Sequence, residues 1–75
     1  MTRYPNRSGN SGVVAYALGK DSITLEFDAG GVYEYTAASA GRTNIERMKA
    51  LAAEGRGLAA FVARNVHERY ARKLS

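Results

Sequence analysis

The sequence predicts an α+β fold, in which a three-stranded antiparallel β-meander has one face covered by two C-terminal α-helices. Residues 13–37 contain three short runs with the two-residue alternation of half-buried strands, separated by glycine-containing turns. Residues 43–74 instead repeat apolar side chains at intervals of three and four, which is the period of an amphipathic helix. A sheet with one apolar face needs a covering layer, and the helices supply it.

The chain of 75 residues has the length of one domain. Residues 1–12 contain proline, glycine, asparagine and hydroxyl residues without an apolar period, so we predict a flexible N-terminal arm there. Arg3, Tyr4 and Arg7 are the side chains of this arm that are suited to a contact surface, although a loose tail is the favoured interpretation. Residues 13–75 then form a single domain with the element order β-β-β-α-α.

The predicted strands are Val13–Leu18, Ser22–Asp28 and Val32–Ala37. The second alternates most regularly, with apolar side chains on one face and polar ones on the other. A tight turn after Leu18 and a three-residue loop at 29–31 set the register. The expected cross-strand pairs are Leu18 with Ile23, Tyr16 with Leu25, Val14 with Phe27, Phe27 with Tyr33, and Leu25 with Tyr35. Both turns place the apolar sets on the same face.

Two helices follow the sheet. The segment Thr43–Glu46 has the spacing of a capping box, and Gly55 is typical of a helix C-terminus. The second helix is expected to begin near Leu58 and to continue through Tyr70 toward Leu74. We expect one core that contains Leu25, Phe27, Tyr33, Tyr35, Phe61 and Val66.

The excess positive charge lies at the C-terminal end. Residues 1–55 have six basic and six acidic side chains, whereas residues 56–75 have five basic side chains and one acid, which gives the net charge of +4. The pI of about 9.8 lies in the range of nucleic-acid-binding domains. We therefore expect a phosphate-binding stripe on the second helix, with Arg64 and Arg72 on one face. The candidate residues are Arg56, Arg64, Asn65, His67, Arg69, Arg72 and Lys73. The alternative is a solvated helix face whose cations complement the helix dipole.

Tyr33 and Tyr35 share one face of the third strand. Two exposed aromatic rings on a strand are suited to stacking on nucleic-acid bases. The predicted register instead places both rings on the side that the helices cover, so we interpret them as core residues whose hydroxyls reach the edge of the core.

Other classes of site find little support. The chain has no cysteine and a single histidine, so we expect no disulfide, no metal site and no catalytic triad. Glu26 and Glu34 share the polar face of the sheet, which is as typical of a solvated sheet as of an acid–base pair. We expect no cofactor, no catalysis and no membrane span, and a cytoplasmic location.

Several short motifs resemble the KTSC domain family, which is named for the C-terminus of some lysyl-tRNA synthetases. The residues that carry the resemblance are Leu25-Glu26-Phe27 with Gly31, Tyr33-Glu34-Tyr35, Ala52-Ala53-Glu54-Gly55-Arg56-Gly57-Leu58, Phe61-Val62-Ala63-Arg64-Asn65-Val66 and Tyr70-Ala71-Arg72. The chain departs from the family pattern where Ala53 replaces a serine, Ala63 an asparagine and His67 a basic residue. The resemblance implies the β-β-β-α-α fold and suggests RNA binding, and the departures imply weaker or altered binding.

The sequence thus predicts a noncatalytic domain that binds nucleic acid, with RNA favoured over DNA, through its basic C-terminal helix. The alternative is a protein-interaction module or a homodimer. The small core and an open edge at Val13–Leu18 favour that alternative.

Overall fold

The computed structural model describes residues 1–5 and 12–75. The predicted α+β class is confirmed, with five antiparallel strands in the described chain in place of the three expected. The strands follow one another across the sheet in the order β1-β2-β3-β4-β5, and they are β1 (Thr2–Arg3), β2 (Val13–Leu18), β3 (Ser22–Phe27), β4 (Val32–Thr36) and β5 (Arg72–Lys73). The helical elements are α1 (Ala37–Ala40), α2 (Arg42–Glu54), α3 (Leu58–Phe61) and the π-helix η1 (Val62–Val66).

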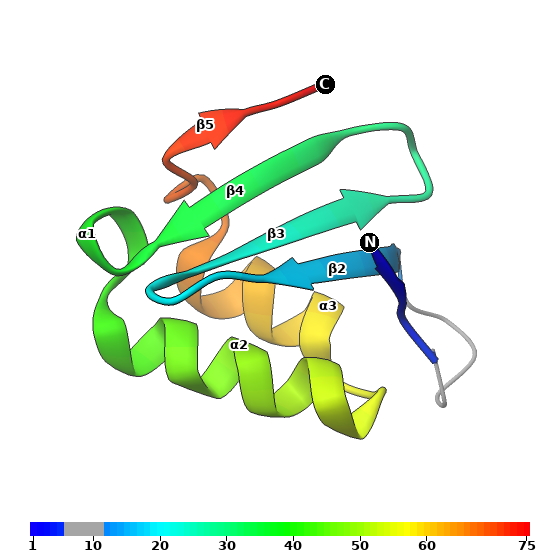
Figure 1. The fold of residues 1–75 in the computed structure, drawn as a ribbon, viewed down its shortest axis with the longest axis horizontal. Coiled ribbons are helices and arrows are strands. Elements are labelled where there is room, and N and C mark those ends of the chain that lie inside the picture. Colours follow the sequence, from blue (N-terminus) through cyan, green and yellow to red (C-terminus); the bar gives the residue numbers. More distant parts are fainter. Residues whose placement is uncertain (6–11) are drawn as a thin grey trace.

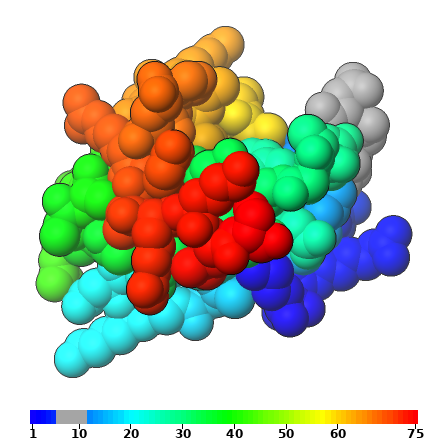
Figure 2. All heavy atoms as spheres, turned by 90° about the horizontal axis from the view of Figure 1, so that it is seen from above, coloured from blue at the N-terminus to red at the C-terminus, as the bar shows by residue number. Residues whose placement is uncertain are grey.

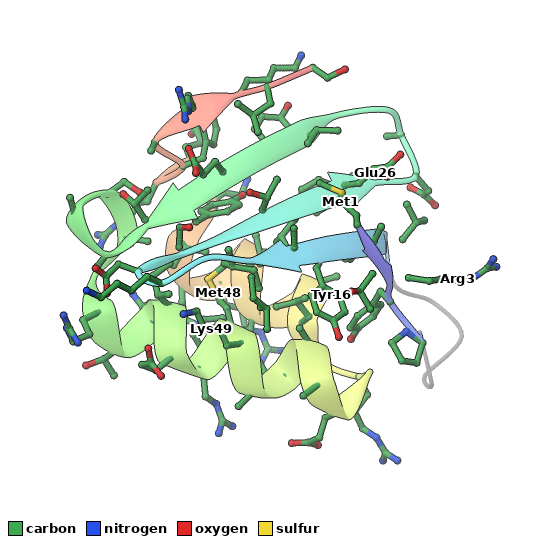
Figure 3. The ribbon with its side chains drawn as sticks, in the orientation of Figure 1. Met1, Arg3, Tyr16, Glu26, Met48 and Lys49 are labelled. Atoms are coloured by element: carbon green, nitrogen blue, oxygen red, sulfur yellow. The ribbon has the colours of Figure 1, made fainter. Side chains whose placement is uncertain are left out.

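Helices α2 and α3 lie against one face of the sheet (Figure 1). Ile23, Leu25 and Tyr35 of the sheet are buried in one cluster with apolar side chains of α2, α3 and η1. Met48 of α2 points up toward the sheet (Figure 3) and is fully buried. Of the six core residues predicted from the sequence, Leu25, Tyr35 and Val66 are buried, while Phe27, Tyr33 and Phe61 are partly buried and pack against the cluster.

The register of the first hairpin is largely as predicted. Leu18 pairs with Ile23 and Tyr16 pairs with Leu25. The expected pair of Val14 with Phe27 is wrong, because a β-bulge places Val13 opposite Phe27. The bulge turns Val13 into the core and leaves Val14 exposed, since an extra residue in one strand reverses the faces beyond it.

The predicted register of the second hairpin is wrong by two residues. Tyr33 pairs with Leu25 and Tyr35 with Ile23. The backbone N–H of Phe27 donates to the carbonyl of Gly31 over 2.8 Å, so the three-residue loop is 28–30 and Gly30 takes the position with φ of 102°. A shift of two keeps every side chain on its predicted face, and for this reason the core is right although the pairs are not.

The prediction of a flexible arm is wrong for residues 1–5. Thr2 and Arg3 pair with β2, and the backbone N–H of Tyr4 donates to the carbonyl of Val14 over 3.0 Å. Tyr4 is 2% exposed, and its hydroxyl accepts a hydrogen bond from the backbone N–H of Leu58 over 3.3 Å. A single ring gives no period in the sequence, so its burial was not predictable. Residues 6–11, including Arg7, lie outside the described part of the chain.

Of the two ends predicted for the first helix, the C-terminal end is correct and the N-terminal end is not. Gly55 ends α2 in the left-handed conformation, as predicted. The capping box lies elsewhere, because Thr36 and Ser39 cap each other at the start of α1, a helix that was not predicted. Helix α2 begins at Arg42 after Gly41, and the Lys49 ammonium of this helix donates to the carbonyls of Gly19 and Lys20 in the β2–β3 turn. Within residues 1–5 and 12–75, no helix has the length and apolar character needed to cross a membrane.

Candidate nucleic-acid interface

The long basic helix that the sequence predicts does not form. Helix α3 continues only as the single π-turn η1, in which the backbone N–H of His67 donates to the carbonyl of Val62 over 2.6 Å. The amide of Asn65 donates to the carbonyl of Phe61 over 3.1 Å, a bond from a side chain to its own helix that competes with regular helical pairing. The helical segment therefore ends at Val66, before most of the predicted stripe.

The chain after His67 returns to the sheet and covers the edge of β4. The backbone N–H of Ala71 donates to the carbonyl of Glu34 over 2.6 Å, and that of Leu74 donates to Val32 over 2.7 Å. Strand β5 thus pairs Arg72 with Glu34. Pairing satisfies the backbone groups of a strand that would otherwise be an open edge, and this tertiary gain overrides the helical pattern of the segment.

The seven candidate residues consequently lie in five places. Arg64 and Asn65 are on η1, His67 directly follows it, and Arg69 is in the loop before β5. Arg72 and Lys73 form β5, and Arg56 is in the turn between α2 and α3. That turn is at the lower right of Figure 1 and β5 is at the top, so the turn that contains Arg56 is remote from β5. The predicted alignment of Arg64 above Arg72 on a single helix is wrong.

Two of the cations already have partners. The Arg72 guanidinium donates to the Glu34 carboxylate over 2.7 Å, and the Lys73 ammonium lies 5.8 Å from the centre of the Tyr33 ring. Arg64 and Arg69 are exposed, and neither forms an ion pair with another described residue. In Figure 2 the residues after α3 run from the upper left of the visible face (orange) to its middle (red).

An aromatic groove lies beside these residues, with a volume of about 380 Å³. Its lining residues are Phe27, Tyr33, Tyr35, Ala59, Val62, Ala63, His67, Glu68 and Tyr70. One wall is therefore formed by β3 and β4, the other by α3 and η1, and the loop after η1 supplies the remaining residues. Ala63 and His67 lie in this groove, and Ala53 is exposed on α2.

Tyr70 packs against two tyrosines of β4. Its ring centre is 4.7 Å from that of Tyr33 and 6.2 Å from that of Tyr35. Tyr33 also meets Phe27 edge to face, at 5.8 Å. Aromatic pairs in these arrangements add about 0.5–1.5 kcal/mol to burial. Sequence reasoning gave Tyr70 only a packing role, because it placed this residue on a helix that does not form.

Tyr35 is a core residue, as predicted. It is 2% exposed, and its hydroxyl donates to the carbonyl of His67 over 3.4 Å. Burial, followed by the neighbouring Tyr33 and Tyr70, raises the pKa of Tyr35 to about 12. The neutral phenol is therefore the form that the folded protein stabilises. Tyr33 is only partly buried and contributes its ring to both core and groove.

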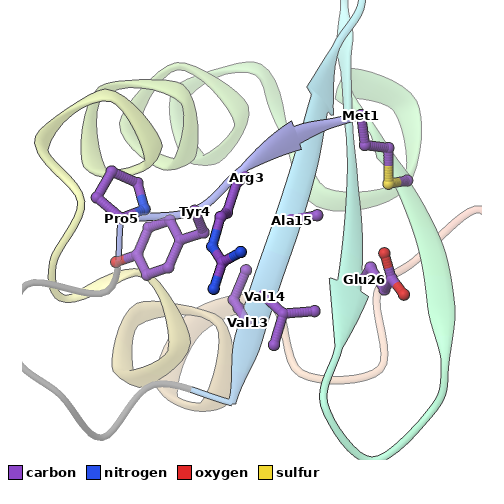
Figure 4. A pocket seen from close by; sticks show the side chains of 8 residues that line it. All are labelled: Met1, Arg3, Tyr4, Pro5, Val13, Val14, Ala15 and Glu26. Carbon is purple, nitrogen blue, oxygen red and sulfur yellow. The ribbon is translucent and has the colours of Figure 1, made fainter.

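A second, larger hollow of about 750 Å³ lies at the opposite edge of the sheet (Figure 4). Arg3 of β1 and Glu26 of β3 are its charged side chains, with Val14 and Met1 beside them. The positive charge of Arg3 and the negative charge of Glu26 cancel. None of the seven candidate nucleic-acid-binding residues lines this hollow. Among the described residues, no three His, Cys, Asp or Glu side chains gather as a metal site would require.

No known protein family, curated protein or solved structure matches this chain in sequence or fold.

Proposed function

We propose that this protein is a noncatalytic domain that binds nucleic acid, with RNA favoured, through the segment that follows α3. The observation that carries the proposal is the position of Arg64 and Arg69, two exposed residues without ion-pair partners among the described residues, whose neighbours in the sequence line an aromatic groove. Guanidinium groups bind phosphate in a bidentate way, and exposed aromatic rings accept stacked bases. RNA is favoured because short motifs of the sequence resemble the KTSC family, a likeness that no family model detects.

The other candidates have smaller roles in this proposal. Arg72 contacts Glu34 and Lys73 lies over Tyr33, so each would have to share its charge with a partner in order to bind phosphate. Arg56 lies at the far end of α3, where a long strand but not a short one would reach it. We therefore expect two or three phosphate contacts, which is fewer than the five basic residues of the segment would provide.

The test is salt-dependent binding of dye-labelled RNA oligonucleotides, measured by fluorescence anisotropy. Replacing Arg64 and Arg69 together by glutamine should weaken binding at low salt. It should also reduce the slope of log affinity against log salt by about 1.4, the value for two phosphate contacts on a single strand.

The matched control replaces Lys20 and Arg47 by glutamine, because both residues are exposed, neither lines the groove, and the pair carries the same charge as Arg64 and Arg69. If the control and the Arg64–Arg69 variant lose the same affinity, only net charge matters and the interface is wrong. If the wild-type protein binds no oligonucleotide at low salt, the proposed function fails. The alternative of a homodimer would then be tested by light scattering.

The two edges of the sheet bear on whether the protein forms a homodimer. Strand Val13–Leu18 was expected to be an open edge, but β1 pairs with Ala15 and Tyr16 in its centre. At the other side of the sheet, β5 covers β4 in the same way. Short edge strands are a common protection against pairing between molecules, so an edge-to-edge dimer loses its main support.

A further inference from the structure

We propose that the aromatic groove binds an unpaired base of a single-stranded nucleic acid, while the cations at its rim hold the flanking phosphates. This inference rests on the proposed function, because it names the part of the ligand that enters the groove. The groove is defined by Tyr33 and Tyr70 on one side and Ala63 on the other.

The rings of the groove are suited to stacking. Tyr70 is 36% exposed although its ring contacts both Tyr33 and Tyr35, so an aromatic surface stays open to a ligand. On the helical wall the lining residues include the small side chains of Ala59 and Ala63, which leave room for a planar group. Stacking of a base on an aromatic side chain contributes affinity with little preference for the identity of the base.

The polar groups of the groove favour a base over a phosphate. The Glu68 carboxylate lines the groove and would repel a phosphate that entered it. The same carboxylate accepts hydrogen bonds from exocyclic amino groups such as that of cytosine. The His67 imidazole is 3.6 Å from this carboxylate and completes the polar end of the groove.

Two exposed cations adjoin lining residues of the groove in the sequence. Arg64 follows Ala63 on the helical wall, and Arg69 precedes Tyr70 in the loop after η1. Lys73 is placed above the Tyr33 ring. A strand that places a base in the groove therefore brings its own phosphates to the cations at the rim. A duplex can use the cations but not the groove, since its bases stay stacked and paired.

The experiment compares four probes at low salt: an eight-nucleotide single-stranded RNA, the same sequence as DNA, the matching RNA duplex and linear polyphosphate. The key variant is Ala63→Phe, which fills the groove without removing a charge or a ring. We expect it to weaken single-strand binding by about tenfold, the loss of one stacked base, and to leave duplex and polyphosphate binding unchanged. Its control is Ala60→Phe, an exposed position on the preceding helix α3 that does not line the groove.

Tyr70 provides a second variant that opens the groove instead of filling it. Tyr70→Ala should weaken single-strand binding to a similar degree, whereas Tyr70→Phe should retain it because the ring is kept. Backbone amide NMR spectra of each variant report whether β4 and β5 remain paired. In the wild-type protein, the ring protons of Tyr33 and Tyr70 should shift on addition of the single strand but not of polyphosphate.

The outcomes separate the two proposals. The groove is supported if either single strand binds more strongly than the duplex and if this difference is lost in Ala63→Phe but kept in Ala60→Phe. The comparison of the RNA strand with the DNA strand then identifies the preferred sugar. Equal binding of all probes, with no effect of Ala63→Phe, overturns the groove and leaves the basic interface standing. Absence of binding to every probe overturns the proposed function itself.

Discussion

The two edges of the sheet use the same device with different results. At each edge, a two-residue strand covers a longer strand, and a tyrosine lies next to the short strand. Tyr4 beside β1 is 2% exposed and hydrogen-bonds to the start of α3, whereas Tyr70 before β5 is 36% exposed and packs on two other rings. The first ring is sealed in the core, while the second stays open to solvent. The comparison indicates that the N-terminal edge stabilises the fold and that the C-terminal edge is the better place for a ligand.

The substitution Tyr4→Ala is the strongest test of the stabilising role of the N-terminal edge. Removing a buried aromatic ring should lower the free energy of unfolding by about 3–5 kcal/mol, which is enough to unfold much of a domain of this size. Urea denaturation followed by circular dichroism measures the change. Tyr4→Phe is the control, because it keeps the ring and loses only the acceptor for the Leu58 N–H. A Tyr4→Ala variant as stable as wild type would show that residues 1–5 are the loose tail that the sequence suggested.

The pH dependence of the free energy of unfolding tests whether the Tyr35 hydroxyl is buried. Since the folded pKa of Tyr35 is about 12 and its ordinary value is 10.0, the folded state holds this proton more tightly than the unfolded state. The stabilisation is complete below pH 10 and is lost as the pH rises toward 12, and the difference amounts to roughly 2–3 kcal/mol. Urea denaturation at a series of alkaline pH values should therefore show a steeper loss in wild type than in Tyr35→Phe. Parallel curves for the two proteins would contradict the burial of this hydroxyl.

The smallest expected effect is at the ion pair of the C-terminal edge. The Arg72 side chain is 69% exposed, so its pair with Glu34 should contribute only about 0.2–1 kcal/mol, and less at high salt. A double-mutant cycle of Arg72→Ala and Glu34→Gln isolates this coupling. A coupling above about 2 kcal/mol would mean that the C-terminal edge holds the fold as firmly as the N-terminal edge.

The candidate site was predicted in part. The sequence identified Arg64 and Arg69 correctly as exposed cations, since their charge and the polar neighbours are visible locally. It did not predict that Tyr70 meets Tyr33, because these two residues are far apart in the sequence. They come together only when β5 pairs with β4. Local periodicity carries no information on such a contact.

What the sequence by itself determined is the α+β class, the apolar face of β3, the tight first turn and the end of α2 at Gly55. Each of these depends on neighbours in the chain, either through the alternation of side chains or through the backbone freedom of glycine. Only the tertiary structure decided the fate of the two ends. Tyr4 enters the core, and Arg72 and Lys73 leave the expected helix for the sheet. The physical reason is the same at both ends, because an unpaired strand edge and an uncovered apolar surface exist only after the central strands have assembled.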